Sequence, residues 1–237
     1  MRFPIRLASF RRRKWILLSL GLALVTASGL AWGVANGWLQ VNNPSNARFP
    51  HRGIDISHHQ GHIDWKTVSG HHLDFVIAKA TEGVDHQDRL FAEHARGALA
   101  TGHKMGAYHF YRLCREGLPQ ARNFLRTIQG TPLEMGASLD LEYGGNCPPL
   151  GSRERTLREI QDFLDTVEAA TGKPVMIYAT PDFHGDWLEG AFPDNPLWIR
   201  SIWTEPRLEG RGWTLWQYAA RGRLAGIEGF VDLNAMR

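Results

Sequence analysis

The sequence predicts an α/β protein, an irregular TIM-like β/α barrel preceded by an N-terminal apolar segment. The chain has 237 residues, a length at which a single α/β barrel is common. About five strand-like segments alternate with helical ones, and this alternation indicates a parallel sheet. Three further strand-like segments follow with little helix between them. Eight strands suggest a closed barrel whose last third is irregular.

The N-terminus joins a basic segment to a long apolar one. Residues 1–14 contain no acid and six basic residues, Arg2, Arg6, Arg11, Arg12, Arg13 and Lys14. Residues 15–35 carry no charge, and about 20 apolar residues span a bilayer. Because basic residues before such a span stay in the cytoplasm, we expect the rest of the chain to be exported. We interpret residues 15–35 as an uncleaved transmembrane signal anchor in the inner membrane, facing the periplasm or the outside.

A cleaved signal peptide, which would release a secreted protein, is the alternative for this apolar segment. The small residues at 33–35 have the spacing that cleavage needs. Residues 36–50 are expected to form a linker, because N-N-P-S-N at 42–46 is polar and contains a proline. The catalytic barrel is then expected to occupy residues 51–237.

Composition narrows the classes of partner. Hydrophobic residues make up 43% and charged residues 22% of the chain, which is typical of a globular domain with a core. Without the six basic residues of the N-terminal segment, the net charge of +3 becomes about −3. A nucleic-acid-binding protein needs a basic face on its folded part. We therefore expect no nucleic-acid partner, and no cofactor is indicated.

The elements of the barrel are predicted from hydrophobic periodicity. Strands are expected at 53–57, 74–80, 104–111, 137–142, 174–179, 197–202, 213–218 and 230–233. Long helices are expected at 88–101, 118–129 and 153–170. Gly102 and Gly172 follow two of these helices as stop signals. Asp64 is expected to be the N-cap of one short helical turn.

Acidic residues fall at the ends of several predicted strands. In β/α barrels, the chemistry occurs at the carboxyl ends of the strands. Four strands place an acid at such an end, namely Asp55, Glu82, Asp140 with Glu142, and Asp232. We therefore expect these acids to lie around one rim of the barrel.

The segment S-L-D-L-E, residues 138–142, holds two of these acids on one strand. Alternate side chains of a strand point to opposite faces, so Asp140 and Glu142 share one face and Leu139 and Leu141 the other. Glycosidases commonly use a pair of carboxyl groups, one kept protonated by a raised pKa. A spacing of roughly 6–7 Å between neighbours on one face is compatible with either retention or inversion. A salt-bridged pair, a solvated pair or a metal site are alternatives.

Cysteines and histidines suggest a disulfide rather than a metal site. Cys114 and Cys147 lie just past the ends of two successive strands, and in an exported chain such a pair favours a disulfide over two free thiols. The histidines at 58, 59, 62, 71 and 72 include H-H-x-x-H, which is not the H-E-x-x-H helix of metalloproteases. We expect exposed loop histidines and no metal.

The folded part resembles the glycoside hydrolase family 25 lysozymes, the N-acetylmuramidases. The resemblance covers about residues 51–235 in family order. Its blocks are G-I-D-I-S-H-H-Q-G-H-I-D-W (53–65), F-V-I-A-K-A-T-E-G (75–83), G-A-Y-H-F-Y (106–111), S-L-D-L-E (138–142), V-M-I-Y (175–178), P-L-W-I (196–199) and W-Q-Y-A-A-R-G-R-L-A-G-I-E-G-F-V-D-L-N (216–234). Together these blocks are far more specific than any one of them.

The resemblance implies an irregular barrel that cleaves the β-1,4 bond between N-acetylmuramic acid and N-acetylglucosamine in peptidoglycan. It implies Glu142 as the proton donor and Asp140 as its assisting carboxylate, which either stabilises positive charge or orients the substrate's acetamido group. Asp55 and Asp232 are the further catalytic acids that it implies. The expected substrate-binding residues are Tyr108, Tyr178, Glu82, Trp198 and Trp216, although barrel tryptophans are more often core residues.

Two other functions remain open at this point. One is a glycosidase that acts on another N-acetylhexosamine polymer. The other is a non-catalytic protein that binds the cell wall.

Overall fold

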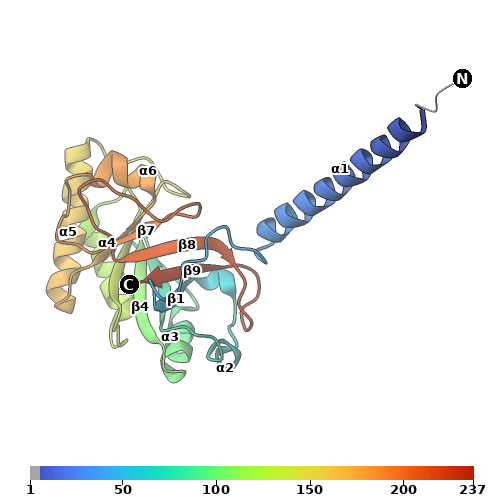
Figure 1. The fold of residues 1–237 in the computed structure, drawn as a ribbon. Helices are drawn as coiled ribbons and strands as arrows, with labels where there is room; N and C mark the ends of the chain where they lie inside the picture. The colour runs from blue at the N-terminus through green and yellow to red at the C-terminus, as the bar shows by residue number, and fades with distance from the viewer. Residues whose placement is uncertain (1–5) are drawn as a thin grey trace, which may run out of the picture. The chain divides into compact units, whose positions relative to one another are not determined.

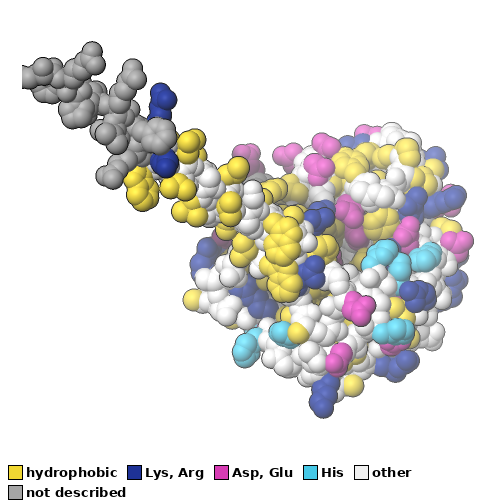
Figure 2. Space-filling model, turned by 90° about the vertical axis from the view of Figure 1, so that its right-hand side faces the viewer, with side chains coloured by type: hydrophobic (Ala, Val, Ile, Leu, Met, Phe, Trp, Pro, Cys, Tyr) yellow, Lys and Arg dark blue, Asp and Glu magenta, His cyan; other side chains and the backbone are white. Residues whose placement is uncertain are grey.

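The computed structural model describes residues 6–237, with side chains from residue 12 onward. It divides into two compact units, one ending at Gln40 and the other comprising Val41–Arg237. The first unit is built on helix α1, Arg6–Ala35, and the coloured part of this helix in Figure 2 is largely apolar. Its segment Arg12–Ala35 has a mean hydropathy of 1.8 and, by length and composition alone, could cross a membrane. A signal sequence has the same properties, and residues 1–5 of the predicted basic segment lie outside the described residues.

The second unit is a closed barrel of eight strands, as the sequence predicts (Figure 1). Seven strands run parallel to one another in the order of the chain, and the last strand closes the barrel by pairing antiparallel with both its neighbours. The eight are β1 (His51–Ile56), β2 (Phe75–Glu82), β4 (Lys104–Phe110), β5 (Gly136–Leu141), β6 (Met176–Ala179), β7 (Leu197–Arg200), β8 (Leu215–Gly222) and β9 (Val231–Met236).

Three long helices cover the outside of the barrel, close to the predicted ranges. They are α3 (Phe91–Ala100), α4 (Gly117–Ile128) and α5 (Arg153–Thr171). Helix α5 begins where Ser152 Oγ accepts a hydrogen bond from the amide of Arg155, and it ends at Gly172, whose φ of 68° suits glycine. The remaining elements are short: η1 (His58–Gln60), α2 (Trp65–Val68), β3 (His86–Gln87), α6 (Pro181–Phe183) and η2 (His184–Leu188).

Two of the short elements bear on the sequence analysis. Asp64 caps α2 as predicted, since its carboxylate accepts a hydrogen bond from the amide of Thr67. Strand β3 was not predicted. It is a two-residue strand that pairs antiparallel with the end of β2, too short to show a periodic pattern of its own.

The core has two parts that follow from strand alternation. Outward-facing strand residues, such as Val76 and Leu139, pack against helix residues such as Phe163, and all three are fully buried. The interior of the barrel holds a separate apolar cluster: Phe75, Ile77, Met176, Tyr178, Trp198 and Leu215. The ring of Phe75 lies 2.2 Å from where a Cβ of Gly53 would stand, so only glycine fits opposite it. This packing fills one end of the barrel.

Candidate active site

A cavity of about 260 Å³ lies at the carboxyl end of the parallel strands. Its lining comprises Asp55, Tyr108, Asp140, Glu142, Tyr178, Trp198, Arg200, Gln217, Ala220 and Asp232. The fold therefore brings together all four predicted catalytic acids and three of the five predicted substrate-binding residues. We call this cavity the cleft.

Strand β5 and the residue after it supply two acids to the cleft. Asp140 and Glu142 both line it, whereas Leu139 and Leu141 are fully buried in the core on the other face, as strand alternation requires. Asp140 is 8% exposed and its Oδ1 has no hydrogen-bond partner among the described residues. The Glu142 side chain is 20% exposed, so it is the more accessible member of the pair.

Burial and charge repulsion raise the pKa of both carboxyl groups. For Asp140, desolvation is the largest cause, and the nearby Glu142 and Asp55 add to it, so its pKa lies well above the usual value. Desolvation also raises the pKa of Glu142, although Arg200 opposes the shift. The Arg200 Nη1 atom lies 4.0 Å from Glu142 Oε2. The pair can thus hold a proton above the pH at which a solvated carboxyl group loses it.

Two amide side chains hold Asp55. Gln217 Nε2 donates a hydrogen bond of 2.9 Å to Asp55 Oδ2, and Asn234 Nδ2 donates one of 2.7 Å to the same oxygen. Each amide is oriented by another donor, because Tyr178 Oη donates to Gln217 Oε1 and Trp198 Nε1 donates to Asn234 Oδ1. We call Gln217 and Asn234 the amide clamp. The clamp presents only donors to Asp55 and so favours its ionised form.

Asp232 lies directly opposite Asp55 on the neighbouring strand. Burial raises the pKa of Asp55 to about 6, against the lowering effect of its hydrogen bonds. Burial and the charge of Asp55 raise the pKa of Asp232 to about 8. Their mutual hydrogen bond lowers the first pKa and raises the second. Near neutral pH, Asp232 is therefore the protonated donor and Asp55 the charged acceptor.

One expectation about Asp232 was wrong in its geometry. The residue was expected at the carboxyl end of its strand, but it is the second residue of β9. It still reaches the rim because β9 runs antiparallel to β1 and β8. The pattern of a single strand carries no information on its direction in the sheet.

Two predicted substrate-binding residues do not line the cleft. Glu82 accepts a hydrogen bond of 2.8 Å from Lys79 Nζ and forms an ion pair with Arg112. Trp216 is 3% exposed, packs against Phe49 and donates its Nε1 hydrogen to a backbone carbonyl. Because side chains alternate along β8, the Gln217 side chain points into the barrel and the Trp216 side chain points out of it. Trp216 is thus a core residue, the alternative that the sequence left open.

Sequence reasoning missed three polar residues of the site, Arg200, Gln217 and Asn234. Arg200 stands two residues after Trp198 on β7, so strand alternation already placed it on the same face. Asn234 has the same relation to Asp232 on β9. Gln217 lay between aromatic residues in W-Q-Y and gave no signal of its own.

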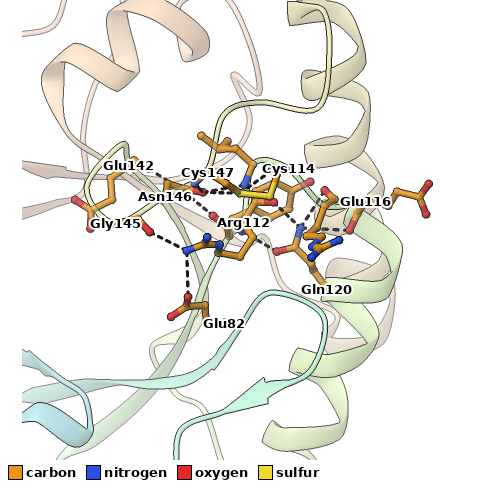
Figure 3. Close-up of a disulfide and its surroundings, with 12 residues drawn as sticks. Glu82, Arg112, Cys114, Glu116, Gln120, Glu142, Gly145, Asn146 and Cys147 are labelled. Atoms are coloured by element: carbon orange, nitrogen blue, oxygen red, sulfur yellow. Dashed lines mark hydrogen bonds and ion pairs between the residues drawn. A yellow bond between two sulfur atoms is a disulfide. The ribbon is translucent and has the colours of Figure 1, made fainter.

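The predicted disulfide joins Cys114 to Cys147, with their Cα atoms 5.7 Å apart. Asn146 lies beside it (Figure 3). The Asn146 Nδ2 atom donates to the carbonyls of Tyr111 and Glu142, and its Oδ1 accepts from the amides of Leu113 and Cys147. The bonds fasten the segment after Glu142 to the loop after β4.

Arg112 adds a second connection between these loops. It pairs with Glu82 at the end of β2 and donates a hydrogen bond of 2.7 Å to the carbonyl of Gly145 (Figure 3). The loop that follows the acid pair is therefore held from both sides. Such fixing limits the motion of Glu142 relative to the rest of the cleft.

Two of the loop histidines pair with acids, and the rings of His58 and His59 also lie against each other, with centroids 4.1 Å apart. His58 Nδ1 lies 2.8 Å from Asp88 Oδ2, and His62 Nδ1 lies 2.6 Å from Glu93 Oε1. Within the described part of the chain, no group of three or more His, Cys, Asp or Glu residues could hold a metal ion. On the face drawn in Figure 2, Lys and Arg side chains are interspersed with acids.

Comparison with known proteins gives one consistent family. The family model described as Glycosyl hydrolases family 25 matches residues 54–227. Lysozyme M1 of Streptomyces globisporus is 34% identical over 198 residues, which are 77% of this chain and 66% of that protein. The N,O-diacetylmuramidase of Chalaropsis sp. is 30% identical over 201 residues, 76% of this chain and 95% of that protein.

Solved structures of similar proteins share the barrel. A family 25 glycosyl hydrolase from Bacillus anthracis superposes with a TM-score of 0.72 at 33% identity, covering 80% of this chain and 89% of that one. A bacterial lysozyme from Streptomyces coelicolor gives a TM-score of 0.71 at 31% identity, with 79% and 92% covered.

Proposed function

This chain belongs to glycosyl hydrolase family 25, and from that membership we propose that it is a lysozyme. It hydrolyses peptidoglycan at the β-1,4 bond between N-acetylmuramic acid and N-acetylglucosamine. The observation that carries the proposal is the carboxyl pair of Asp140 and Glu142 in the cleft, both with a raised pKa. Relatives named lysozyme and N,O-diacetylmuramidase support peptidoglycan as the substrate.

We assign the role of general acid to Glu142. It is the more exposed acid of the pair, and burial keeps its proton available to the leaving oxygen of the scissile bond. Asp140 assists from beside it, either by stabilising positive charge at the sugar or by orienting the substrate's acetamido group. Asp55, held ionised by the amide clamp, contributes negative charge to the same transition state. Asp232 fixes Asp55 through its shared proton.

The test is hydrolysis of purified peptidoglycan by the full chain in detergent. New reducing ends should appear at muramic acid, and Glu142→Gln should lower kcat by about 10²–10⁴-fold. Glu134→Gln, a change at an exposed residue that does not line the cleft, is the matched control. Equal release of reducing ends by Glu142→Gln and the control would rule out Glu142 as the acid. Product analysis on a second N-acetylhexosamine polymer separates the muramidase from a broader glycosidase.

We also propose how the chain is placed in the cell. Residues 15–35 form the transmembrane signal anchor, residues 1–14 stay in the cytoplasm, and the barrel is exported behind the linker at 36–50. The apolar helix supports this assignment. Mass measurement of the protein from washed membranes tests it. A mature protein that lacks residues 1–35 and leaves the membrane in salt would instead identify a cleaved signal peptide.

A further inference from the structure

Arg200 is the one cationic side chain among the described residues that line the cleft. It ends β7, two residues after Trp198, and both side chains face the cleft because of strand alternation. The Arg200 side chain is 36% exposed. A guanidinium at this position faces the space that a glycan strand would enter.

The hydrogen-bonding capacity of Arg200 is almost unused. Among the described residues, its one side-chain polar contact is the ion pair of 4.0 Å with Glu142 Oε2, which is too long for a hydrogen bond. Two other cations near the rim are engaged. Lys79 binds Glu82 at 2.8 Å, and Arg112 binds both Glu82 and the carbonyl of Gly145. Arg200 therefore keeps a planar set of N–H donors directed at the cleft.

The electrostatics of the cleft allow an anion next to Arg200 in spite of four acids. Asp232, with a pKa of about 8, is protonated at neutral pH. Burial favours the protonated forms of Asp140 and Glu142 as well. Asp55, with a pKa of about 6, carries a negative charge at neutral pH. With these shifts and the guanidinium of Arg200, the cleft is less negative than four ionised carboxylates would make it.

A guanidinium pairs with a carboxylate through two parallel hydrogen bonds. If the substrate is the peptidoglycan glycan, its muramic acid carries such a group on the lactyl arm. The carboxylate is the lactyl group itself in peptide-free strands, or the first acidic residue of an attached stem peptide. We propose that Arg200 recognises this carboxylate and thereby selects muramic acid over other N-acetylhexosamines. This inference rests on the proposed function and names the group that confers specificity.

The rival role for Arg200 is to act only on Glu142, whose pKa it lowers. Asp55, Asp232 and Asp182 also lie within its electrostatic influence. A change of Arg200 would then alter the acidity of Glu142 for every substrate alike. Recognition of a carboxylate predicts a loss only for substrates that carry the charge. A pair of substrates that differ in one charge therefore separates the two roles.

The experiment compares two muramic acid oligosaccharides, one with free lactyl carboxylates and one with the same groups converted to carboxamides. The ratio of their kcat/KM values is measured for the wild-type chain, Arg200→Gln and the exposed control Arg158→Gln. We expect a ratio of about ten for the wild type and the control, expressed mainly in KM. For Arg200→Gln we expect a ratio near one.

A second pair of oligosaccharides identifies the source of the carboxylate. These carry a stem dipeptide whose acidic residue is free or amidated, and a preference in this pair alone assigns the contact to the stem peptide. An Arg200→Gln variant that loses activity equally on charged and neutral substrates would overturn the proposal. Dissociation constants measured with Glu142→Gln give the same ratio without turnover. Because these constants do not depend on turnover, they test recognition of the carboxylate even if the proposed hydrolysis is not observed.

Discussion

Removal of the Asn234 side chain should destabilise the barrel more at pH 7 than at pH 4. Asn234 is fully buried. Its Nδ2 atom donates a hydrogen bond of 2.7 Å to Asp55 Oδ2, and its Oδ1 atom accepts one of 2.8 Å from Trp198 Nε1. A hydrogen bond to a charged group contributes about 1.5–3 kcal/mol and a neutral one about 1 kcal/mol. Asn234→Ala should therefore lower the free energy of unfolding by roughly 2.5–4 kcal/mol at pH 7.

The pH dependence follows from the protonation of Asp55. Its pKa in the folded state is about 6, above the ordinary value of 3.8, so its ionisation costs stability as the pH rises through this interval. Loss of the Asn234 donor raises this pKa further. The added cost is absent at pH 4, where the folded state holds Asp55 protonated, and appears as the pH rises above 6. The destabilisation should thus be about 1–2 kcal/mol smaller at pH 4 than at pH 7.

Urea unfolding of the full chain in detergent, followed by tryptophan fluorescence at both pH values, measures this difference. Asn123→Ala is the matched control, because Asn123 is equally buried and donates only to the backbone carbonyls of Gly83 and His86. Its cost should not change with pH. In an Asp55→Asn background, Asn234→Ala should also lose its pH dependence. The same destabilisation at both pH values in the wild-type background would refute a clamp that holds a carboxylate.

Three further outcomes are expected. The pH profile of kcat/KM should be bell-shaped. Its acidic limb should lie near the pKa of Asp55, about 6, and its basic limb should reflect loss of the Glu142 proton. A flat profile between about pH 4 and 8 would contradict this pairing of groups. Asn146→Ala removes four hydrogen bonds that hold the loop after Glu142. The kcat should therefore fall about tenfold or more with little change in KM. A change in KM alone would argue against a positioning role for Asn146. Replacement of Cys114 and Cys147 by serine removes a cross-link between residues 33 positions apart and should lower the free energy of unfolding by about 3–4 kcal/mol. Unfolding of the wild-type chain with and without reductant measures the same loss. An unfolding midpoint that reduction leaves unchanged would contradict the expectation.

Much of the fold could be predicted because its signals are local in the chain. The helix at 153–170 is observed as α5, one residue longer at its end, since its apolar spacing lies within the segment and its two caps lie directly beside it. The strand at 137–142 is observed as Gly136–Leu141. Strand β3 was missed because two residues are too few for any period to appear.

The prediction of the site was less complete, and two predicted substrate-binding residues lie outside the cleft. Glu82 stands at a strand end, as a cleft residue would, but Lys79 and Arg112 draw its carboxylate into ion pairs outside the cleft lining. Trp216 matches a family block, yet its side chain lies on the outer face of β8 against Phe49. In both cases the side-chain partners of the folded protein, and not the position within the strand, decided where the side chain lies.

By itself, the sequence determined the acid pair. Alternation within one strand places Asp140 and Glu142 on a common face and their two leucines on the other, whatever the rest of the chain does. It also determined the apolar N-terminal segment and which cysteines could meet. Each of these features depends on neighbours in the chain or on the order of elements.

Only the tertiary structure decided how the acids differ from one another. Asp55 meets Gln217 and Asn234 from 162 and 179 positions away, and Asp232 faces it because the last strand runs antiparallel. Closure of the barrel brings these groups into a poorly hydrated cleft, where burial and hydrogen bonds set the pKa of Asp55 at about 6 and that of Asp232 at about 8. The sequence of one strand does not show which strands pair with it or how exposed its side chains are. Those two properties determine which carboxyl group holds a proton.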